Sequence, residues 1–420
     1  MASLPYSFRP VKALFLLPFL LVSTLVARAE SWPEFRGPGR EGHTAAKLPL
    51  TWSPTNNVAW KIEVPGKGWS SPVVVNGRII VTTAVKEGSG YSLQALAFNA
   101  ADGKPAWSTV VFSPSSMAAI HGKNSHASPT PLIEGDRVYV HFGHQGTAAL
   151  TLDGKLLWKT TEHSYKPVHG NGGSPVIFGD NLIFSADGDS KPAIIALDKN
   201  TGKTVWKQAR VADAKRKFSF ATPLIITNAG RVELISPGSG MVGGLDPRTG
   251  KELWRVNYGE GYSVIPRPIV GHGMVFIGTG YDSPKVLGIR LGGTGDVTAT
   301  HLAWTISRSA PHTPSMVLVG EELYFVSDAG VASCVDAKTG AVHWQERVGG
   351  GYSSSLLHAG GRIYAQNEAG LTTVLAVGKE FKVLAKNDLE ERSLASFGVV
   401  DDSLLIRTDA HLFRITGASK

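Results

Sequence analysis

The stretch that decides the fold is Ala196-Leu-Asp-Lys-Asn-Thr-Gly-Lys-Thr-Val-Trp206, which reads as a strand end, a polar turn and a new strand that opens with tryptophan. The turn chemistry is specific, because an aspartate side chain folds onto nearby backbone N–H groups and glycine takes the positive φ that tight turns need. The same order of residues returns in 99–107, 151–158, 244–254 and 334–344. Such self-similarity indicates one supersecondary unit that is used many times.

Tryptophan marks a fixed position in this repeat. Seven of the ten tryptophans occupy it, two of them after divergent turns, and neighbours lie 40–51 residues apart. They are Trp60, Trp107, Trp158, Trp206, Trp254, Trp304 and Trp344.

A second pattern lies between the tryptophans: an apolar strand, a two-residue turn and another apolar strand. It occurs eight times, starting at Ser71, Thr130, Ser174, Thr222, Arg267, Ser315, Ser355 and Ser396. Four-stranded units at this spacing are typical of propeller blades, the architecture also built by WD40-type repeats. The sequence therefore predicts an all-β fold, an eight-bladed β-propeller of four-stranded antiparallel blades.

The two ends of the repeat array predict how the ring closes. The last unit ends one strand short, whereas residues 57–64 form a spare strand with an orphan tryptophan ahead of the first unit. Pairing them would complete the eighth blade and cover an open sheet edge, which is otherwise prone to aggregation. We expect a signal peptide at 1–29, an N-terminal extension at 30–51, the propeller at 52–416 and a tail at 417–420.

The N-terminus has the order of a secretory signal. Arg9 and Lys12 precede an apolar run at 13–26, and Ala27-Arg28-Ala29 offers a small-x-small cleavage site. The run is short for a bilayer span, so we expect cleavage after Ala29 and a periplasmic or secreted protein without a membrane span; an uncleaved anchor is the alternative.

Charge and cysteine content exclude other classes. Removal of three basic residues with the signal lowers the formal charge from +8 to +5, and the remaining basic residues are scattered apart from 215–217. Nucleic-acid binders concentrate charge in stripes, so no nucleic-acid partner is expected. The lone Cys334 allows no internal disulfide, and we expect a monomer.

The Ala-Leu-Asp-x-x-Thr-Gly-Lys-x-x-Trp turn resembles the tryptophan-docking repeat of the pyrroloquinoline-quinone (PQQ) propeller superfamily. That group includes quinoprotein alcohol dehydrogenases and the outer-membrane assembly lipoprotein BamB. The opening at 32–40, Trp-Pro-Glu-Phe-Arg-Gly-Pro-Gly-Arg, is similar to the start of exported PQQ-like repeat proteins of planctomycete-type bacteria. The resemblance implies the fold, which hosts both enzymes and scaffolds.

The resemblance also implies what a dehydrogenase would carry: adjacent cysteines over the quinone, and carboxylates and amides around calcium, which takes six to eight oxygen ligands. One cysteine cannot form that disulfide, and the nearest acidic cluster is the short Asp187-Gly-Asp-Ser stretch. No cofactor is therefore expected, with PQQ and calcium as the alternative. No metal is expected either, since sequence does not show that His121, His126 and His169 converge.

Propeller geometry predicts where a ligand would bind. Loops that precede each blade, and loops between second and third strands, open on one face around the channel mouth, and their sequences are irregular and polar. The candidate ligand-binding residues in them are His121, Asn124, His126, His169, Asn171, Arg267, Asp282, His312, Asp328, Tyr352 and Glu368.

These features favour a non-catalytic binding or scaffolding propeller, which recognises an envelope protein or a small ligand on its loop face. Neither a Gly-x-Ser-x-Gly elbow nor a His-Glu-x-x-His motif is present. Two alternatives remain: a quinoprotein-type oxidoreductase, and a carbohydrate-binding propeller that uses Tyr165, Tyr262, Tyr281 and Tyr352.

Overall fold

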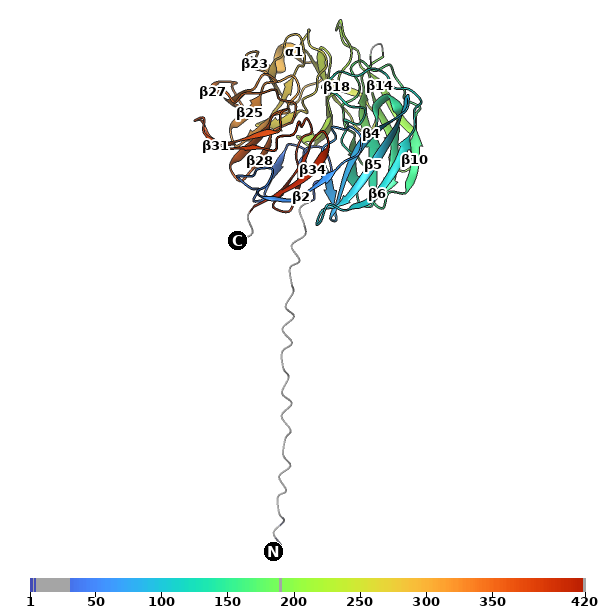
Figure 1. The fold of residues 1–420 in the computed structure, drawn as a ribbon. Coiled ribbons are helices and arrows are strands. Elements are labelled where there is room, and N and C mark those ends of the chain that lie inside the picture. Colours follow the sequence, from blue (N-terminus) through green and yellow to red (C-terminus); the bar gives the residue numbers. More distant parts are fainter. Residues whose placement is uncertain (3, 5–30, 189–190, 418–420) are drawn as a thin grey trace.

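Eight antiparallel sheets surround a central channel in the computed structural model, which confirms the predicted eight-bladed propeller (Figure 1). The structure describes residues 1–2, 4, 31–188 and 191–417. Nearly all of the expected signal peptide, its cleavage site after Ala29, and tail residues 418–420 lie outside the described residues.

The first four blades take their strands in chain order from the channel outward. They are blade one, β3 (Val73–Val75), β4 (Arg78–Glu87), β5 (Gly90–Asn99) and β6 (Pro105–Phe112); blade two, β7 (Leu132–Glu134), β8 (Arg137–His141), β9 (Thr147–Thr151) and β10 (Leu156–Thr160), with a 3₁₀ turn η1 (Gly143–Gln145); blade three, β11 (Val176–Phe178), β12 (Asn181–Ala186), β13 (Ala193–Asp198) and β14 (Thr204–Ala209); and blade four, β15 (Leu224–Asn228), β16 (Arg231–Gly238), β17 (Met241–Leu245) and β18 (Glu252–Asn257).

The other four blades follow the same plan, with two additions and one exchange. They are blade five, β19 (Ile269–Gly271), β20 (Met274–Gly278), β21 (Val286–Arg290) and β23 (Leu302–Ile306); blade six, β24 (Val317–Val319), β25 (Glu322–Val326), β26 (Val331–Asp336) and β27 (Val342–Arg347); blade seven, β28 (Leu357–Ala359), β29 (Arg362–Gln366), β30 (Leu371–Ala376) and β31 (Val383–Asp388); and blade eight, β32 (Gly398–Val400), β33 (Ser403–Arg407), β34 (His411–Thr416) and β2 (Val58–Glu63). Two short strands pair in parallel with finished blades: β1 (His43–Thr44) with β28, and β22 (Gly295–Asp296), followed by α1 (Thr298–His301), with β18.

The N-terminal strand closes the ring, as predicted. Strand β2 pairs antiparallel with β34 from Val58 opposite Ile415 to Glu63 opposite His411. In Figure 1 these two strands lie side by side, one from the blue start and one from the red end of the chain. Blade eight is therefore assembled from both chain ends, which leaves no unpaired edge between first and last blade.

The repeat tryptophans join each blade to the next. Six of the seven donate the indole N–H to a backbone carbonyl, at 2.9–3.3 Å, in the turn between third and fourth strands of the following blade. A one-residue register shift just before Trp206 turns the indole toward blade four and leaves Val205 pointing outward. The turn glycine is required there, because a Cβ on Gly250 would lie 2.5 Å from the Trp206 ring.

A belt of hydroxyl groups holds the innermost strands together. Seven of the eight blades carry Ser or Thr two residues before their first strand, and six of these hydroxyl oxygens accept the backbone N–H of the preceding blade at 2.9–3.1 Å. The belt residues are Ser71, Thr130, Ser174, Thr222, Ser315, Ser355 and Ser396, with Arg267 in the remaining place. The belt fixes the bore of the channel.

The N-terminal extension crosses the channel below the belt. Trp32 exchanges two 2.8 Å backbone hydrogen bonds with Val74 of blade one. The Arg267 guanidinium then donates to the Phe35 carbonyl at 2.6 Å and to Glu34 Oε2 at 3.2 Å. Further along, β1 pairs with blade seven. We call residues 32–44 the plug, because they close the channel at the end opposite the loop face.

Trp206→Ala should lower the free energy of unfolding by about 3–5 kcal/mol, the usual cost of truncating a buried aromatic side chain. Trp206 is only 9% exposed, whereas its neighbour Val205 is 49% exposed. Val205→Ala is therefore the matched control and should change stability by no more than about 0.5 kcal/mol in denaturant unfolding. Equal small losses for both variants would contradict the docking role of the tryptophan.

Thr222→Val keeps the shape of the belt residue but removes the oxygen that accepts the Ser174 N–H. The buried donor then has no partner, and we expect a loss of about 1–3 kcal/mol in unfolding free energy. Thr222→Ser retains the oxygen and should lose much less. Equal stability of the valine and serine variants would show that the belt hydrogen bond contributes nothing.

A histidine pair on the plug predicts acid sensitivity. The Nδ1 atoms of His43 and His358 lie 3.0 Å apart, and burial lowers the pKa of both rings, that of His43 to about 4. The unfolded chain, with a pKa of about 6.5, binds these protons first, so stability should fall as the pH drops from about 6.5 toward 4. We expect the decline in melting temperature over this range to be shallower in His43→Asn; an unchanged profile would contradict it.

Candidate functional site

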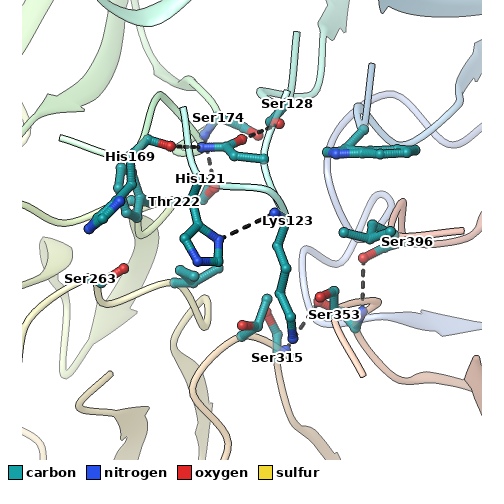
Figure 2. Close-up of a pocket in the computed structure, with 18 of the residues that line it drawn as sticks. His121, Lys123, Ser128, His169, Ser174, Thr222, Ser263, Ser315, Ser353 and Ser396 are labelled. Carbon is teal, nitrogen blue, oxygen red and sulfur yellow. Dashed lines mark hydrogen bonds between the residues drawn. The ribbon is translucent and has the colours of Figure 1, made fainter. Parts of the chain in front are cut away.

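A pocket of about 450 Å³ opens at the loop face, directly above the belt. Phe35 of the plug forms its floor, and all seven hydroxyl residues of the belt lie in its wall together with Trp69 and Leu394. His121 and Lys123, from the loop between β6 and β7, extend over the pocket (Figure 2), and Asn124 of the same loop also lines it. We call this space the mouth pocket.

The wall of the mouth pocket is formed largely by the hydroxyl belt. Six of the oxygens already accept a backbone N–H from the neighbouring blade, so their O–H groups are left as donors toward the channel. The wall therefore offers hydrogen-bond donors around its circumference, held at fixed positions by the blades themselves.

A continuous series of aromatic rings runs along one side of the rim. Each ring contacts the next at a centroid distance of 4.4–6.3 Å, and the series passes from the loop before blade two to the loop before blade six. The six members are His121, His169, Phe218, Tyr262, Tyr281 and His312. We call this series the aromatic arc; it presents flat surfaces on which a planar or apolar group can stack.

A guanidinium group lies on the arc. The Arg216 side chain sits over the Tyr262 ring at 4.5 Å and donates a hydrogen bond to its hydroxyl, which in turn donates to Asp282 at 3.2 Å. Burial lowers the pKa of the neighbouring His169, and the nearby His121 and Arg216 lower it further. His169 is therefore neutral at pH 7, and Arg216 carries the positive charge on this side of the pocket.

A second cation, Lys123, faces the opposite side. Its Nζ lies 2.7 Å from Glu368 Oε1 and 3.9 Å from Asp328 Oδ2. Burial alone would lower the pKa of Lys123, but the hydrogen bond and charge of Glu368 and the charge of Asp328 raise it above its usual value. The lysine is therefore fully charged, and it connects blade two to blades six and seven.

Seven of the eleven candidate residues predicted from the sequence lie in or beside the mouth pocket. His121, Asn124 and His169 line it. The other four reach it through a lining residue: Asp282 through Tyr262, His312 through Tyr281, and Asp328 and Glu368 through Lys123.

The structure places the other four candidate residues away from the pocket, each buried. His126 packs edge-on against Tyr91, 4.8 Å between ring centroids, and so does not join His121 and His169. Asn171 accepts a 3.0 Å hydrogen bond from the Tyr165 hydroxyl, beside His144.

Arg267 and Tyr352 are both completely buried. Arg267 holds the plug, and the Tyr352 backbone N–H donates to the Asp328 carbonyl at 3.1 Å. Their contacts are within the protein, so these two side chains support the walls of the mouth rather than facing its interior.

Sequence reasoning missed several contributors to the pocket, among them Lys123, Arg216, the floor residue Phe35 and the hydroxyl belt. The belt had a signal, because Ser or Thr opens seven of the eight strand-turn-strand patterns. No comparable signal marks Phe35, which reaches the pocket only because the extension crosses the channel.

The residues present do not fit the quinone and calcium site that the resemblance implies. No aspartate, glutamate or cysteine is among the residues that line the mouth pocket, whereas calcium requires several oxygen ligands, usually including carboxylates. Asp187 is buried in an ion pair with Arg210 at 3.1 Å, and position 189 lies outside the described residues. Within the described ranges, no group of three or more His, Cys, Asp or Glu side chains is placed to hold a metal ion.

Cys334 is also remote from such a role. It is buried in β26, where burial raises the pKa of its thiol to about 11. A thiol in this environment is neutral and unreactive.

The structure resembles solved propellers of two functional kinds. BamB from Moraxella catarrhalis superimposes with a TM-score of 0.60 at 16% identity, covering 86% of this chain and 98% of that one. The quinohemoprotein alcohol dehydrogenase from Comamonas testosteroni gives a TM-score of 0.63 at 12% identity, covering 93% and 81% respectively. At these identities the likeness shows the fold alone.

Among curated proteins, a quinoprotein ethanol dehydrogenase from Pseudomonas aeruginosa is 38% identical over 96 residues, which cover 20% of this chain and 15% of the relative. A quinone-dependent 1-butanol dehydrogenase from Thauera butanivorans is 35% identical over 96 residues, with the same coverage. The matched part thus spans less than a sixth of the length of these relatives.

Family assignment rests on a longer match. Three overlapping stretches, residues 50–177, 154–290 and 238–381, match the family described as outer membrane protein assembly factor BamB. Together they cover most of the eight blades, including all seven repeat tryptophans. The chain belongs to this BamB family of PQQ-like β-propellers.

Proposed function

We propose that this protein is an exported, non-catalytic binding propeller that holds a small ligand or a segment of an envelope protein in its mouth pocket. The observation that carries the proposal is the lining of that pocket. It combines stacking rings, two cations and a ring of hydroxyl donors above a closed floor. Such groups bind and orient a ligand, and they lack the carboxylates that would serve as acid, base or metal ligand.

The histidines of the pocket also support binding over catalysis. A hydrolytic site needs a base within hydrogen-bond reach of its nucleophile. The Nδ1 atom of His121 instead accepts the backbone N–H of Lys123 at 3.2 Å. Hydrogen bonds from either His121 or His169 side chains to the pocket hydroxyls are absent among the described residues.

The proposal extends to location and partners. With the signal at 1–29 removed, the protein would act in the periplasm or outside the cell, as a monomer. None of the helices in the described part of the chain is long and apolar enough to cross a membrane. An envelope protein is the favoured partner class, because the family is described as an outer membrane protein assembly factor.

A quinoprotein oxidoreductase is the second candidate, favoured by the identity to quinoprotein ethanol dehydrogenase over 96 residues. The absence of carboxylates from the pocket lining argues against it. A carbohydrate binder is the third candidate, although only Tyr262 and Tyr281 of the four tyrosines considered for it line the pocket.

Native mass spectrometry of the exported protein tests the proposal, because it would detect a ligand that copurifies. The affinity of the protein for that ligand is then measured. Arg216→Ala should weaken this binding about two- to fivefold, since a cation over an exposed aromatic ring contributes about 0.5–1 kcal/mol. The melting temperature should stay within the small range of surface substitutions. Lys251→Ala, an exposed lysine in a turn on the opposite face, is the matched control and should bind normally.

A dye-linked dehydrogenase assay with added PQQ and calcium separates the proposal from its rival. We expect no alcohol oxidation by the wild-type protein. Robust quinone-dependent turnover would overturn the binding proposal and establish the enzyme.

A further inference from the structure

One side chain spans the mouth of the propeller. Lys123 comes from the loop between β6 and β7, and Figure 2 shows it extended across the pocket toward Ser315 and Ser353, which belong to the far side of the ring. Its ammonium group ends against Glu368 and Asp328, at 2.7 and 3.9 Å. Blades two and six lie opposite each other in an eight-membered ring, so this contact bridges the channel.

The two carboxylates are positioned by their own blades and not by the lysine. Asp328 Oδ1 accepts the backbone N–H groups of His312 and Thr313 at 2.9 Å each, and its Oδ2 accepts the Thr313 hydroxyl at 2.7 Å. Glu368 Oε1 accepts the Ser353 hydroxyl at 2.7 Å. The pair would therefore keep its geometry if Lys123 left.

The charges around the pair suit one more cation. Two carboxylates face one ammonium, and the nearest other cationic candidate, His312 Nδ1, lies 4.0 Å from Asp328 Oδ2. The carboxylate side chains are only 12% and 20% exposed, so their charge is incompletely screened by water. The stacked rings of Tyr281 and His312, 4.4 Å apart, provide an aromatic wall close to the acids.

The loop that carries Lys123 also has hydrogen bonds to the loop before blade three, and these do not involve Lys123. The His121 backbone N–H and the Asn124 side-chain amide both donate to the His169 carbonyl, at 3.1 and 2.8 Å. On the far side the described ion pairs of this loop are those of Lys123. Release of this one side chain would therefore free the loop from blades six and seven while its base stays attached to blade three.

We infer that Asp328 and Glu368 form a binding site for a primary ammonium group, which Lys123 occupies as an internal ligand. An alkylammonium group, either a lysine side chain of a partner protein or a free alkylamine, displaces Lys123 and uncovers the mouth pocket. The inference deepens the proposed binding function and rests on it for the partner, but the ammonium site is testable by itself.

The probe for the site is n-butylammonium chloride, measured by calorimetry with Lys123→Ala, in which the internal occupant is absent. An internal competitor lowers the apparent affinity for the probe, because only molecules whose site is empty can bind it. The variant should therefore bind the probe at least about tenfold more tightly than the wild type. The double variant Lys123→Ala/Glu368→Gln should lose most of that binding. n-Butanol and sodium chloride at matched concentration should not bind, and Lys217→Ala, which removes an exposed lysine of the same face, should behave as the wild type.

Hydrogen exchange of residues 113–128 provides a second measurement that does not depend on affinity. Exchange of this loop should be faster in Lys123→Ala, and n-butylammonium should not restore the wild-type rate, because the probe fills the site without reconnecting the loop. A Lys123→Ala protein that binds no amine, or binds it as well after Glu368→Gln, would overturn the inference. Unchanged loop exchange in a folded Lys123→Ala variant would overturn the opening of the mouth.

The source of the ammonium group is resolved by comparing n-butylammonium with Nα-acetyl-lysine amide. Tighter binding of the peptide-like probe indicates a protein lysine, and tighter binding of the simple amine indicates a small ligand. Failure of the proposed function is distinguishable: quinone-dependent turnover would refute that function while amine binding to Lys123→Ala stands. Conversely, partner binding that depends on Arg216, without amine binding, would refute the inference alone.

Discussion

The hydrogen bond from a backbone N–H to the hydroxyl of the next blade is the interaction on which this propeller depends. Repeated at 2.9–3.1 Å, it sets the distance between neighbouring innermost strands and therefore the width of the channel. Blade five breaks the pattern, because Arg267 stands where the others carry Ser or Thr. The exception has a structural use: a guanidinium is long enough to reach the plug, and Arg267 binds Phe35 and Glu34 there. The belt thus makes the pocket wall, and its exception holds the pocket floor.

The series of tryptophan contacts between blades is interrupted at blade eight, which is assembled from both ends of the chain. Each docking tryptophan needs a turn between the third and fourth strands of the following blade, and blade eight has none, because its third strand β34 and its outer strand β2 are not consecutive in the chain. The outer strand of blade seven accordingly lacks a tryptophan. Instead, Asn387 of that strand binds Trp52 and Leu50 of the extension at 3.0 Å each. Terminal residues therefore fill the seam that the repeat leaves open.

The sequence predicted the fold more completely than the site, for physical reasons. Strand periodicity, turn chemistry and the tryptophan position are local, so the blades and their closure followed from them. Trp254 shows the limit of this locality: its indole binds Glu233, because blade five replaces the usual turn with the segment that carries β22 and α1. Site residues depend on which loops fold over one another. Asn171 and His126 have the same polar character and the same kind of loop as Asn124 and His169, yet neighbouring loops bury the first two and leave the second two at the pocket.

Membership of the family does not by itself determine the function of this chain. Assembly factor and dehydrogenase share the blade repeat, which is a packing device, so the repeat does not discriminate between them. The proposed binding function rests instead on the residues at the mouth. A quinone and calcium would need carboxylates directed into the pocket, whereas two of the acids beside it, Asp328 and Glu368, are directed to a lysine of the protein itself. Lys123 partly compensates the charge of these two acids, and Arg216 carries a positive charge on the other side of the pocket; under the proposed function, an arriving ligand would exchange these internal contacts for its own. Such an exchange would change which groups are paired without transferring a proton, an electron or a chemical group, which is why we propose a binding role for these residues.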